Sequence, residues 1–170
     1  PNDEVSMPRG SVKTDWEVEL GVVIGKTAKY VTQADALDHV AGYCPFLDGS
    51  VRDFQGQSVI AGKNFQHSGS CGPWMTTADE IADPMNLQLT TRLNGDVVQN
   101  ESTEQLFYSV PNIIAYVSQF TPLHPGDVIA TGTPSGVGAG RKPPLWMKPG
   151  DRIEVEISGL GCLANNVVAE

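Results

Sequence analysis

Glu17 and Glu19 are the strongest candidates for a functional role in this sequence. They stand two positions apart in the segment 15–25, whose other residues are mostly apolar. Because side chains alternate between the faces of a strand, the two glutamates share one face, while the other carries Val18, Leu20, Val22 and Ile24. Two carboxylates held roughly 7 Å apart by the strand rise would repel each other without a positive charge between them. A hard divalent cation with oxygen ligands would satisfy both groups.

Glu154 and Glu156 form a second pair with the same spacing, in the segment 151–158. They alternate cleanly with Ile153, Val155 and Ile157, which is typical of a half-buried antiparallel strand with one face in water. We therefore interpret the second pair as solvated. The pattern alone leaves a second interpretation of Glu17 and Glu19: they are also solvated, at the edge of a sheet, where ionisable groups often lie.

Two short helices are predicted. The first covers residues 32–42, where Thr32 and Asp35 resemble a capping box and Gly42 ends the pattern. Its apolar face would carry Ala36, Leu37, Val40 and Ala41. The second begins near Ser109, because a proline at position 111 is tolerated in a first turn, and runs to about Phe120. Its inward residues would be Ile113, Ile114, Val117 and Phe120.

Turn sequences indicate a mainly β (α+β) fold. The dipeptide at 94–95, Asn-Gly, is a strong hairpin signal between strands predicted at 87–93 and 97–99. Pro-Gly-Asp occurs twice, at 125–127 and at 149–151, and each copy leads into an apolar stretch. Residues 1–14 lack a hydrophobic period, so we expect an extended lead-in to the Glu17–Glu19 strand.

Two polar segments could build a site. Residues 43–74 have little periodicity, and a loop of such length is usually functional; it contains Asp48, Arg52, Asp53, Gln55, Lys63 and His67. Residues 131–138 are rich in glycine and hydroxyl groups, which would let a ligand approach the backbone. A flexible connection between strands is an equal alternative for this second loop, and its glycine spacing is not that of a phosphate-binding loop.

Composition limits the classes of partner. The 170 residues suit one domain, and a net charge of −9 without a basic cluster argues against nucleic acid or an anionic membrane as partners. Three cysteines, Cys44, Cys71 and Cys162, neither pair evenly nor form a metal motif, so we expect free thiols in a reducing compartment, with the cytoplasm as the default. No apolar run approaches the ~20 residues of a membrane span, and the first residues lack the pattern of a signal peptide.

An ordered set of motifs resembles the fumarylacetoacetate hydrolase superfamily from about Asp15 to the C-terminus. These motifs are Asp15-x-Glu17-x-Glu19-Leu-Gly-Val-Val-Ile-Gly, Val40-Ala-Gly-Tyr43, Asp48-x-x-x-Arg52-Asp-x-Gln55, Gly62-Lys63, Gly72-Pro73-Trp74, Asn94-Gly95 and the segment 125–134, Pro-Gly-Asp-Val-Ile-Ala-Thr-Gly-Thr-Pro. The resemblance implies a catalytic domain built as a mixed β-sandwich roll with a few short helices, spanning residues 1–170. It also implies a bound Mg²⁺ or Mn²⁺ and a homodimer.

Position by position, the resemblance implies a role for each of seven residues. Glu17, Glu19 and Asp48 would ligate the metal, and Lys63 would be the catalytic cation. Arg52 and Gln55 would position a small diketo or 2-oxo acid, and Thr133 would bind its carboxylate. Such a chelated substrate is a better electrophile, while Lys63 would stabilise the developing charge or protonate the carbanion.

The implied reaction is metal-dependent hydrolysis of a C–C bond in a 1,3-diketo acid, such as an acylpyruvate. Decarboxylation or isomerisation of a related 2-oxo or 2-hydroxydienoic acid is the first alternative, and a non-catalytic family remnant is the second. Hydrolytic relatives activate water with a His–Glu pair before the Glu-x-Glu strand, and we expect that segment to be missing from this chain. His67 lies near Lys63 in sequence but not at the family's histidine position.

Overall fold

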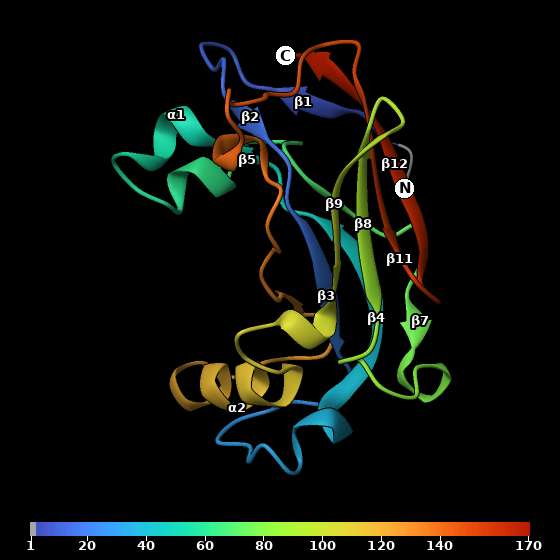
Figure 1. Cartoon of the computed structure of the whole chain (residues 1–170). Helices are drawn as coiled ribbons and strands as arrows, with labels where there is room; N and C mark the ends of the chain where they lie inside the picture. Colours follow the sequence, from blue (N-terminus) through green and yellow to red (C-terminus); the bar gives the residue numbers. More distant parts are fainter. Residues whose placement is uncertain (1–2) are drawn as a thin grey trace.

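The computed structural model describes residues 3–170 and consists mainly of strands (Figure 1). One five-stranded sheet has the order β1 (Val5–Met7), β12 (Gly161–Ala169), β11 (Arg152–Ile157), β8 (Gln88–Leu93), β9 (Asp96–Ser102). A second has the order β10 (Val128–Ala130), β3 (Val18–Ile24), β4 (Val40–Leu47), β6 (Ser70–Cys71), with β7 (Thr76–Thr77) also paired to β4. A third pair joins β2 (Thr14–Asp15) to β5 (Ser50–Val51). This architecture confirms the predicted mainly β class.

The helices are short. Two are α-helical, α1 (Arg52–Gln55) and α2 (Val110–Phe120). The others are single 3-10 turns: η1 (Ala36–His39), η2 (Ala61–Lys63), η3 (Ala78–Glu80), η4 (Thr103–Gln105) and η5 (Gly138–Gly140). In Figure 1, α1 and α2 lie toward opposite ends of the long strand β3.

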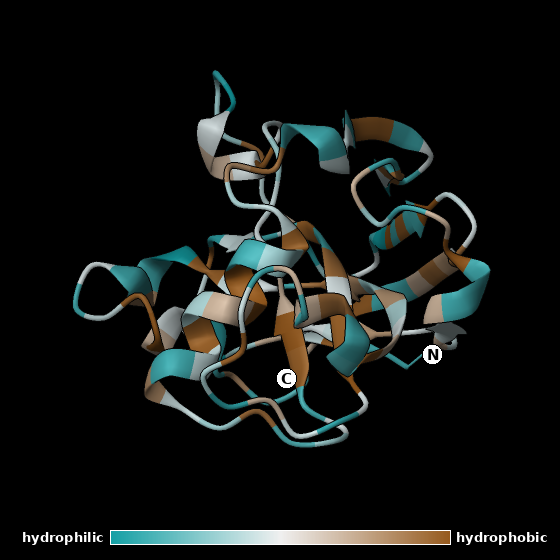
Figure 2. Ribbon diagram, turned by 90° about the horizontal axis from the view of Figure 1, so that it is seen from below, coloured by the Kyte–Doolittle hydropathy of each residue, from teal (hydrophilic) through white to brown (hydrophobic). Residues whose placement is uncertain are grey.

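The core lies between the two large sheets. The apolar side chains of β3 pack into one buried cluster with those of β11 and β12, including Ile153, Ile157 and Leu163. Figure 2 shows hydrophobic residues concentrated in the interior strands and hydrophilic residues in the peripheral turns. Because one face of β3 is committed to this core, Glu19 must point to the opposite face, as the alternation predicts.

The predicted turns and hairpin are confirmed. Asn94 and Gly95 both have positive φ, 53° and 90°, as a type I′ turn requires. The β8–β9 register pairs Thr91 with Gln99 but Arg92 with Val97, which leaves Val98 as a β-bulge. The Pro-Gly-Asp turns precede β10 and β11.

The prediction for the second helix is largely confirmed. The Ser109 side chain caps α2, Pro111 lies in the first turn, and Ile114 is fully buried. The inward placement of Phe120 is wrong, because its side chain is 66% exposed and contacts Tyr116 instead, with ring centroids 5.5 Å apart. The helical spacing of apolar residues continues through the last turn of α2, where the Phe120 side chain no longer faces the core.

The predicted helix over 32–42 is wrong. Only the turn η1 forms, and Val40 already begins β4, which pairs antiparallel with β3 from Val40 to Leu47. The hydrogen bonds to a neighbouring strand override the local helical pattern, and Leu37 is left exposed. As a result, the polar segment predicted from residue 43 begins only after Leu47, and it contains α1 and η2.

The lead-in is extended but also pairs with the sheets, which its sequence did not indicate. Strand β1 lies parallel to β12, with Val5 opposite Val167, and Thr14 of β2 lies opposite Val51. Residues 1 and 2 of the predicted lead-in lie outside the described residues. All three cysteines are free thiols, as predicted. Across residues 3–170, no helix is long and apolar enough to cross a membrane.

Candidate metal centre

Glu17, Glu19 and Asp48 come together at one end of the β3–β4 pair. Glu17 directly precedes β3, Glu19 lies within it, and Asp48 directly follows β4. The Asp48 backbone N–H donates to the Glu17 carbonyl at 2.9 Å, which fixes the two residues side by side. One carboxylate oxygen from each residue lies within 4.8 Å of the others. Glu17 and Glu19 are 7% and 4% exposed and Asp48 is partly buried, so three acids converge with little access to water at the two glutamates.

Lys63 lies against this carboxylate triad. Its Nζ donates to Glu17 Oε2 at 2.7 Å and to Asp48 Oδ2 at 2.6 Å. The turn η2 brings it there, and the preceding Gly62 permits the close approach, because a Cβ at this position would lie 2.3 Å from Gln55 Cγ. The lysine is therefore held by two of the three candidate ligands.

Arg52 supports the triad from the other side. Its Nη2 donates to Glu17 Oε1 at 2.6 Å, its Nε to Asp15 Oδ2 at 2.9 Å and its Nη1 to Gln55 Oε1 at 3.0 Å. Asp15 was missed as a site residue although it opens the family motif. It is fully buried and also accepts hydrogen bonds from the backbone of Gly138 and Ala139. Asp15 thus orients Arg52 and has no oxygen directed at the triad.

The electrostatics of the cluster suit a divalent cation. Asp15, Glu17, Glu19 and Asp48 face two side-chain cations, Arg52 and Lys63, so two negative charges remain when all the groups are ionised. The pKa of Glu19 is raised to about 7, mainly by burial and also by the neighbouring carboxylates of Asp48 and Glu17, although the Gly132 N–H and Lys63 lower it.

Burial shifts the pKa values of Asp48 and Lys63, which pair with each other, in opposite directions. Burial also raises the pKa of Asp48, although Lys63 lowers it. Burial lowers the pKa of Lys63, but its bonds to Asp48 and Glu17 more than compensate, so its pKa lies above the ordinary value. Lys63 therefore remains an ammonium in the metal-free protein. Buried carboxylate oxygens with surplus negative charge are the donor set that Mg²⁺ and Mn²⁺ prefer, so the residues fit such an ion.

The loop at 131–135 lies along β3 and is not a loose connection. Thr131 Oγ1 donates to the Leu20 carbonyl at 3.0 Å, and Thr133 Oγ1 donates to the Val18 carbonyl at 2.9 Å. Between them, the Gly132 N–H donates to Glu19 Oε2 at 2.9 Å. This loop therefore places a backbone donor directly on one member of the triad.

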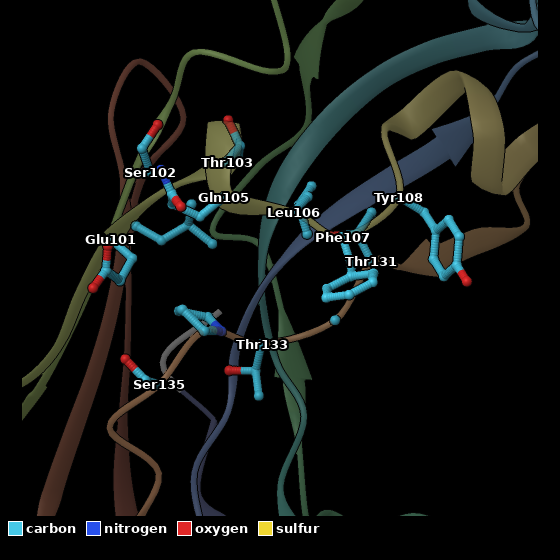
Figure 3. Close-up of a pocket in the computed structure, with 13 residues that line it drawn as sticks. Glu101, Ser102, Thr103, Gln105, Leu106, Phe107, Tyr108, Thr131, Thr133 and Ser135 are labelled. Atoms are coloured by element: carbon cyan, nitrogen blue, oxygen red, sulfur yellow. The ribbon is translucent and has the colours of Figure 1, made fainter.

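A pocket of about 390 Å³ opens beside this loop (Figure 3). Residues 131–135 form one wall, and residues 101–103 and 105–108 form the opposite wall, whose Phe107 lies beside Thr131 in Figure 3. Gly132 lines this pocket and donates to Glu19, whereas Glu17, Glu19, Asp48 and Lys63 are not among the residues that line it. Apart from Glu101, the lining side chains are uncharged.

Other candidates lie apart from the triad. His67 hydrogen-bonds through its ring to Gln66 at 3.4 Å, and its backbone carbonyl accepts from Ser6. Glu154 and Glu156 are partly exposed, as predicted, but each pairs with an arginine, Arg152 at 3.1 Å and Arg92 at 2.6 Å, respectively. Gln99 of β9, which contacts Thr133, was also missed, since a glutamine in a hairpin carries no signal of its own.

The fold and the triad together define a β-roll domain with a candidate divalent-metal centre. The family model described as "Fumarylacetoacetate (FAA) hydrolase C-terminal" matches residues 1–168. The chain belongs to this family, which confirms the resemblance inferred from the motifs.

Named relatives within the family differ in their reactions. The chain is 48% identical over 172 residues to a mitochondrial oxaloacetate tautomerase, FAHD2A of Homo sapiens, covering 99% of the chain and 55% of that protein. It is 50% identical over 165 residues to a putative hydrolase of Burkholderia ambifaria, covering 95% of the chain and 58% of that protein. The chain thus spans a little over half the length of these curated relatives.

Solved structures show the same fold. A fumarylacetoacetate hydrolase from Exiguobacterium antarcticum superposes with a TM-score of 0.95 at 39% identity, covering 100% of this chain and 62% of that one. A maleylpyruvate hydrolase from Sphingobium sp. SYK-6, in complex with manganese(II) and pyruvate, superposes with a TM-score of 0.88 at 38% identity, covering 99% and 60%. The family therefore includes a member that binds Mn(II) together with a 2-oxo acid.

Proposed function

We propose that this chain is the catalytic domain of a divalent-metal-dependent enzyme that acts on a small diketo or 2-oxo acid through its enolate. One observation carries the proposal: the Lys63 ammonium lies between Glu17 and Asp48 of a carboxylate triad in which both glutamates are buried. The three carboxylates would supply oxygen ligands to a divalent cation, and Lys63 would be a neighbouring positive charge. Binding of Mn(II) and pyruvate by the maleylpyruvate hydrolase supports both halves of this proposal.

Glu17, Glu19 and Asp48 would hold Mg²⁺ or Mn²⁺, which when bound would act as a Lewis acid toward the substrate oxygens. Residues of the chain itself would stabilise the developing charge, deliver the proton and orient the ligands. In hydrolysis, water would add to the acyl carbon, and the C–C bond would break to release an acid and an enolate. Lys63 would stabilise the negative charge of that enolate and deliver a proton to its carbon. Arg52 would hold the Glu17 carboxylate and the Gln55 side chain in place through its hydrogen bonds to both.

The reaction proposed first is hydrolysis of the C–C bond of a 1,3-diketo acid such as an acylpyruvate. The hydrolase names of two relatives support it. Tautomerisation of an oxaloacetate-like acid is a second candidate, favoured by the 48% identity to a relative with that name. In this second reaction the enol hydroxyl would lose its proton to solvent water, and Lys63 would stabilise the resulting enolate and deliver a proton to its carbon.

The two reactions can be separated by their products. The protein is assayed with saturating Mg²⁺ or Mn²⁺ on an acylpyruvate, with released pyruvate measured by a coupled dehydrogenase. In parallel, the decay of enol absorbance is followed on oxaloacetate. Pyruvate release would establish hydrolysis, whereas enol decay without pyruvate release would establish tautomerisation. Metal binding without turnover of either acid would favour the non-catalytic alternative.

We also propose a homodimer, for which an aromatic surface of Phe107, Tyr108, Tyr116 and Phe120 offers support. These four side chains are each more than 60% exposed, and residues 105–123 include no Asp, Glu, Lys or Arg. In a chain of net charge −9, an uncharged surface is where a second copy can approach with the least repulsion. Cytoplasmic localisation stays a proposal, and the human relative is named as mitochondrial.

A further inference from the structure

Gln99 connects the two large sheets directly behind the candidate metal centre. It belongs to β9 of the first sheet, and its side chain is 2% exposed. Its Oε1 accepts from the Val18 backbone N–H at 3.1 Å and from Thr91 Oγ1 at 2.9 Å. Its Nε2 donates to Thr133 Oγ1 at 2.9 Å and to the Pro134 carbonyl at 3.0 Å. One carboxamide thus makes four hydrogen bonds to three separate segments.

The orientation of this carboxamide is uniquely determined. The Val18 N–H can only donate and the Pro134 carbonyl can only accept, so the oxygen of Gln99 must face β3 and the nitrogen must face the loop. Thr133 Oγ1 then accepts from Gln99 and must give its own proton to the Val18 carbonyl. Both backbone groups of Val18 are therefore tied, directly or through Thr133, to one buried side chain.

Val18 separates the candidate ligands Glu17 and Glu19, and Thr133 follows Gly132, whose N–H holds Glu19. We propose that Gln99 is a positioning residue of the metal centre. Its carboxamide sets the backbone between the two glutamates and the loop that orients the second of them. The inference rests on the proposed metal-dependent function, and it extends the site beyond the seven residues predicted from the family motifs.

The β-bulge at Val98 makes this arrangement possible. It shifts the register of β9 just before Gln99, and the Val98 carbonyl accepts from Arg141 Nη2 at 2.8 Å. The loop can pass close to the bulge only because residue 136 is glycine, since a Cβ there would lie 2.3 Å from the Val98 carbonyl oxygen. The β8–β9 hairpin and the loop that contains Gly136 therefore pack closely against each other next to the Gln99 side chain.

Gln99→Met tests the inference, because methionine fills a similar volume without forming these hydrogen bonds. Thr91→Val is the matched control: Thr91 is also fully buried and bonds to the same carboxamide, but its side chain makes no hydrogen bond to β3 or to the loop. Partners that orient metal ligands commonly account for 10- to 100-fold in affinity. We therefore expect the Kd for Mn²⁺ to rise about 10-fold or more in Gln99→Met and to change less than about 2-fold in Thr91→Val.

Mn²⁺ affinity is measured from the electron paramagnetic resonance signal of free Mn²⁺, and thermal unfolding of the metal-free variants is measured alongside. Equal loss of stability with unequal loss of affinity supports positioning, whereas loss of affinity in proportion to stability in both variants overturns it. Gln99→Glu provides a second measurement should Gln99→Met not fold, since it keeps the acceptor for Val18 but removes the donor to Thr133. Wild-type affinity in Gln99→Glu and Gln99→Met also overturns the inference, while a wild-type protein that binds no Mn²⁺ refutes the proposed function itself.

Discussion

Replacing Lys63 by methionine should lower stability and turnover but raise metal affinity. The substitution removes two charge-assisted hydrogen bonds, of 2.7 and 2.6 Å, from carboxylates whose side chains are 10% and 20% exposed. Such bonds contribute about 1.5–3 kcal/mol each when buried, and partial exposure reduces the sum. We expect the free energy of unfolding of the metal-free protein to fall by about 3 kcal/mol.

Metal affinity should move the other way. The ammonium and a cation bound to the same carboxylates repel each other, and unit charges roughly 4 Å apart do so by about 4 kcal/mol at an effective dielectric constant of 20. A third of that energy suffices to tighten metal binding about 10-fold in Lys63→Met. Saturating Mn²⁺ should therefore restore much of the lost stability, because it replaces the missing positive charge.

Turnover should fall despite the tighter metal. One preorganised electrostatic contact in the transition state contributes about 3 kcal/mol, so kcat should drop roughly 100-fold with little change in KM. Lys63→Arg should not restore it, because a guanidinium cannot deliver a proton near neutral pH.

The assays for Lys63 are thermal unfolding, Mn²⁺ titration and steady-state kinetics. Lys29→Met serves as the control, since Lys29 is exposed and donates only to the Gln119 carbonyl. Wild-type kcat in Lys63→Met, or weaker metal binding, would refute the reasoning.

Three further predictions concern the metal and the assembly. Mn²⁺ should raise the Tm of the wild-type protein and of Glu154→Gln, whereas Glu17→Gln combined with Glu19→Gln should abolish the rise; a persisting shift in the double variant would place the metal elsewhere. Because burial raises the folded-state pKa of Glu19 from 4.5 to about 7, the folded protein binds more protons between these values, so metal-free stability should fall as pH rises from 4.5 to 7 and then level off. Mn²⁺ affinity should rise over the same interval, and a flat pH profile of both quantities would contradict this assignment. By light scattering, Tyr116→Asp should be monomeric while Tyr30→Asp, which alters an equally exposed aromatic residue outside the aromatic surface, should remain dimeric; identical masses would remove the aromatic surface from the dimer interface.

Much of the sheet structure could be predicted because its signals are local. The alternation around Glu19 and the Asn94-Gly95 turn report directly on a face and on a reversal of the chain. The helix predicted at 32–42 failed because the pairing partner of Val40 lies in β3, and no local pattern encodes that hydrogen-bonded neighbour. Phe120 continued a helical period past the point where the helix meets the core.

The candidate site likewise contains residues that could be predicted from the sequence and residues that could not. Glu17 and Lys63 could be proposed because charged groups in family motifs indicate chemistry, and the structure places them in contact. Asp15 and Gln99 act through hydrogen bonds to residues more than 30 positions away. The position of Gln99 in the sequence does not indicate a functional role. That role could be inferred only from the structure, in which the two large sheets face each other.

Arg52 and Lys63, the two side-chain cations of the centre, both lie in one excursion of the chain, the segment from α1 to η2. Helix α1 has no buried residue, and beyond the edge contact between Phe54 and Phe65 the excursion is held mainly through Arg52, Asp53 and Lys63. A segment with so little buried apolar surface is among the first to unfold locally. When it detaches, both positive charges leave together and the acids remain with each other. Because the contacts that hold this excursion are largely ionic, we expect its amide exchange rate to depend more on salt than that of the sheets.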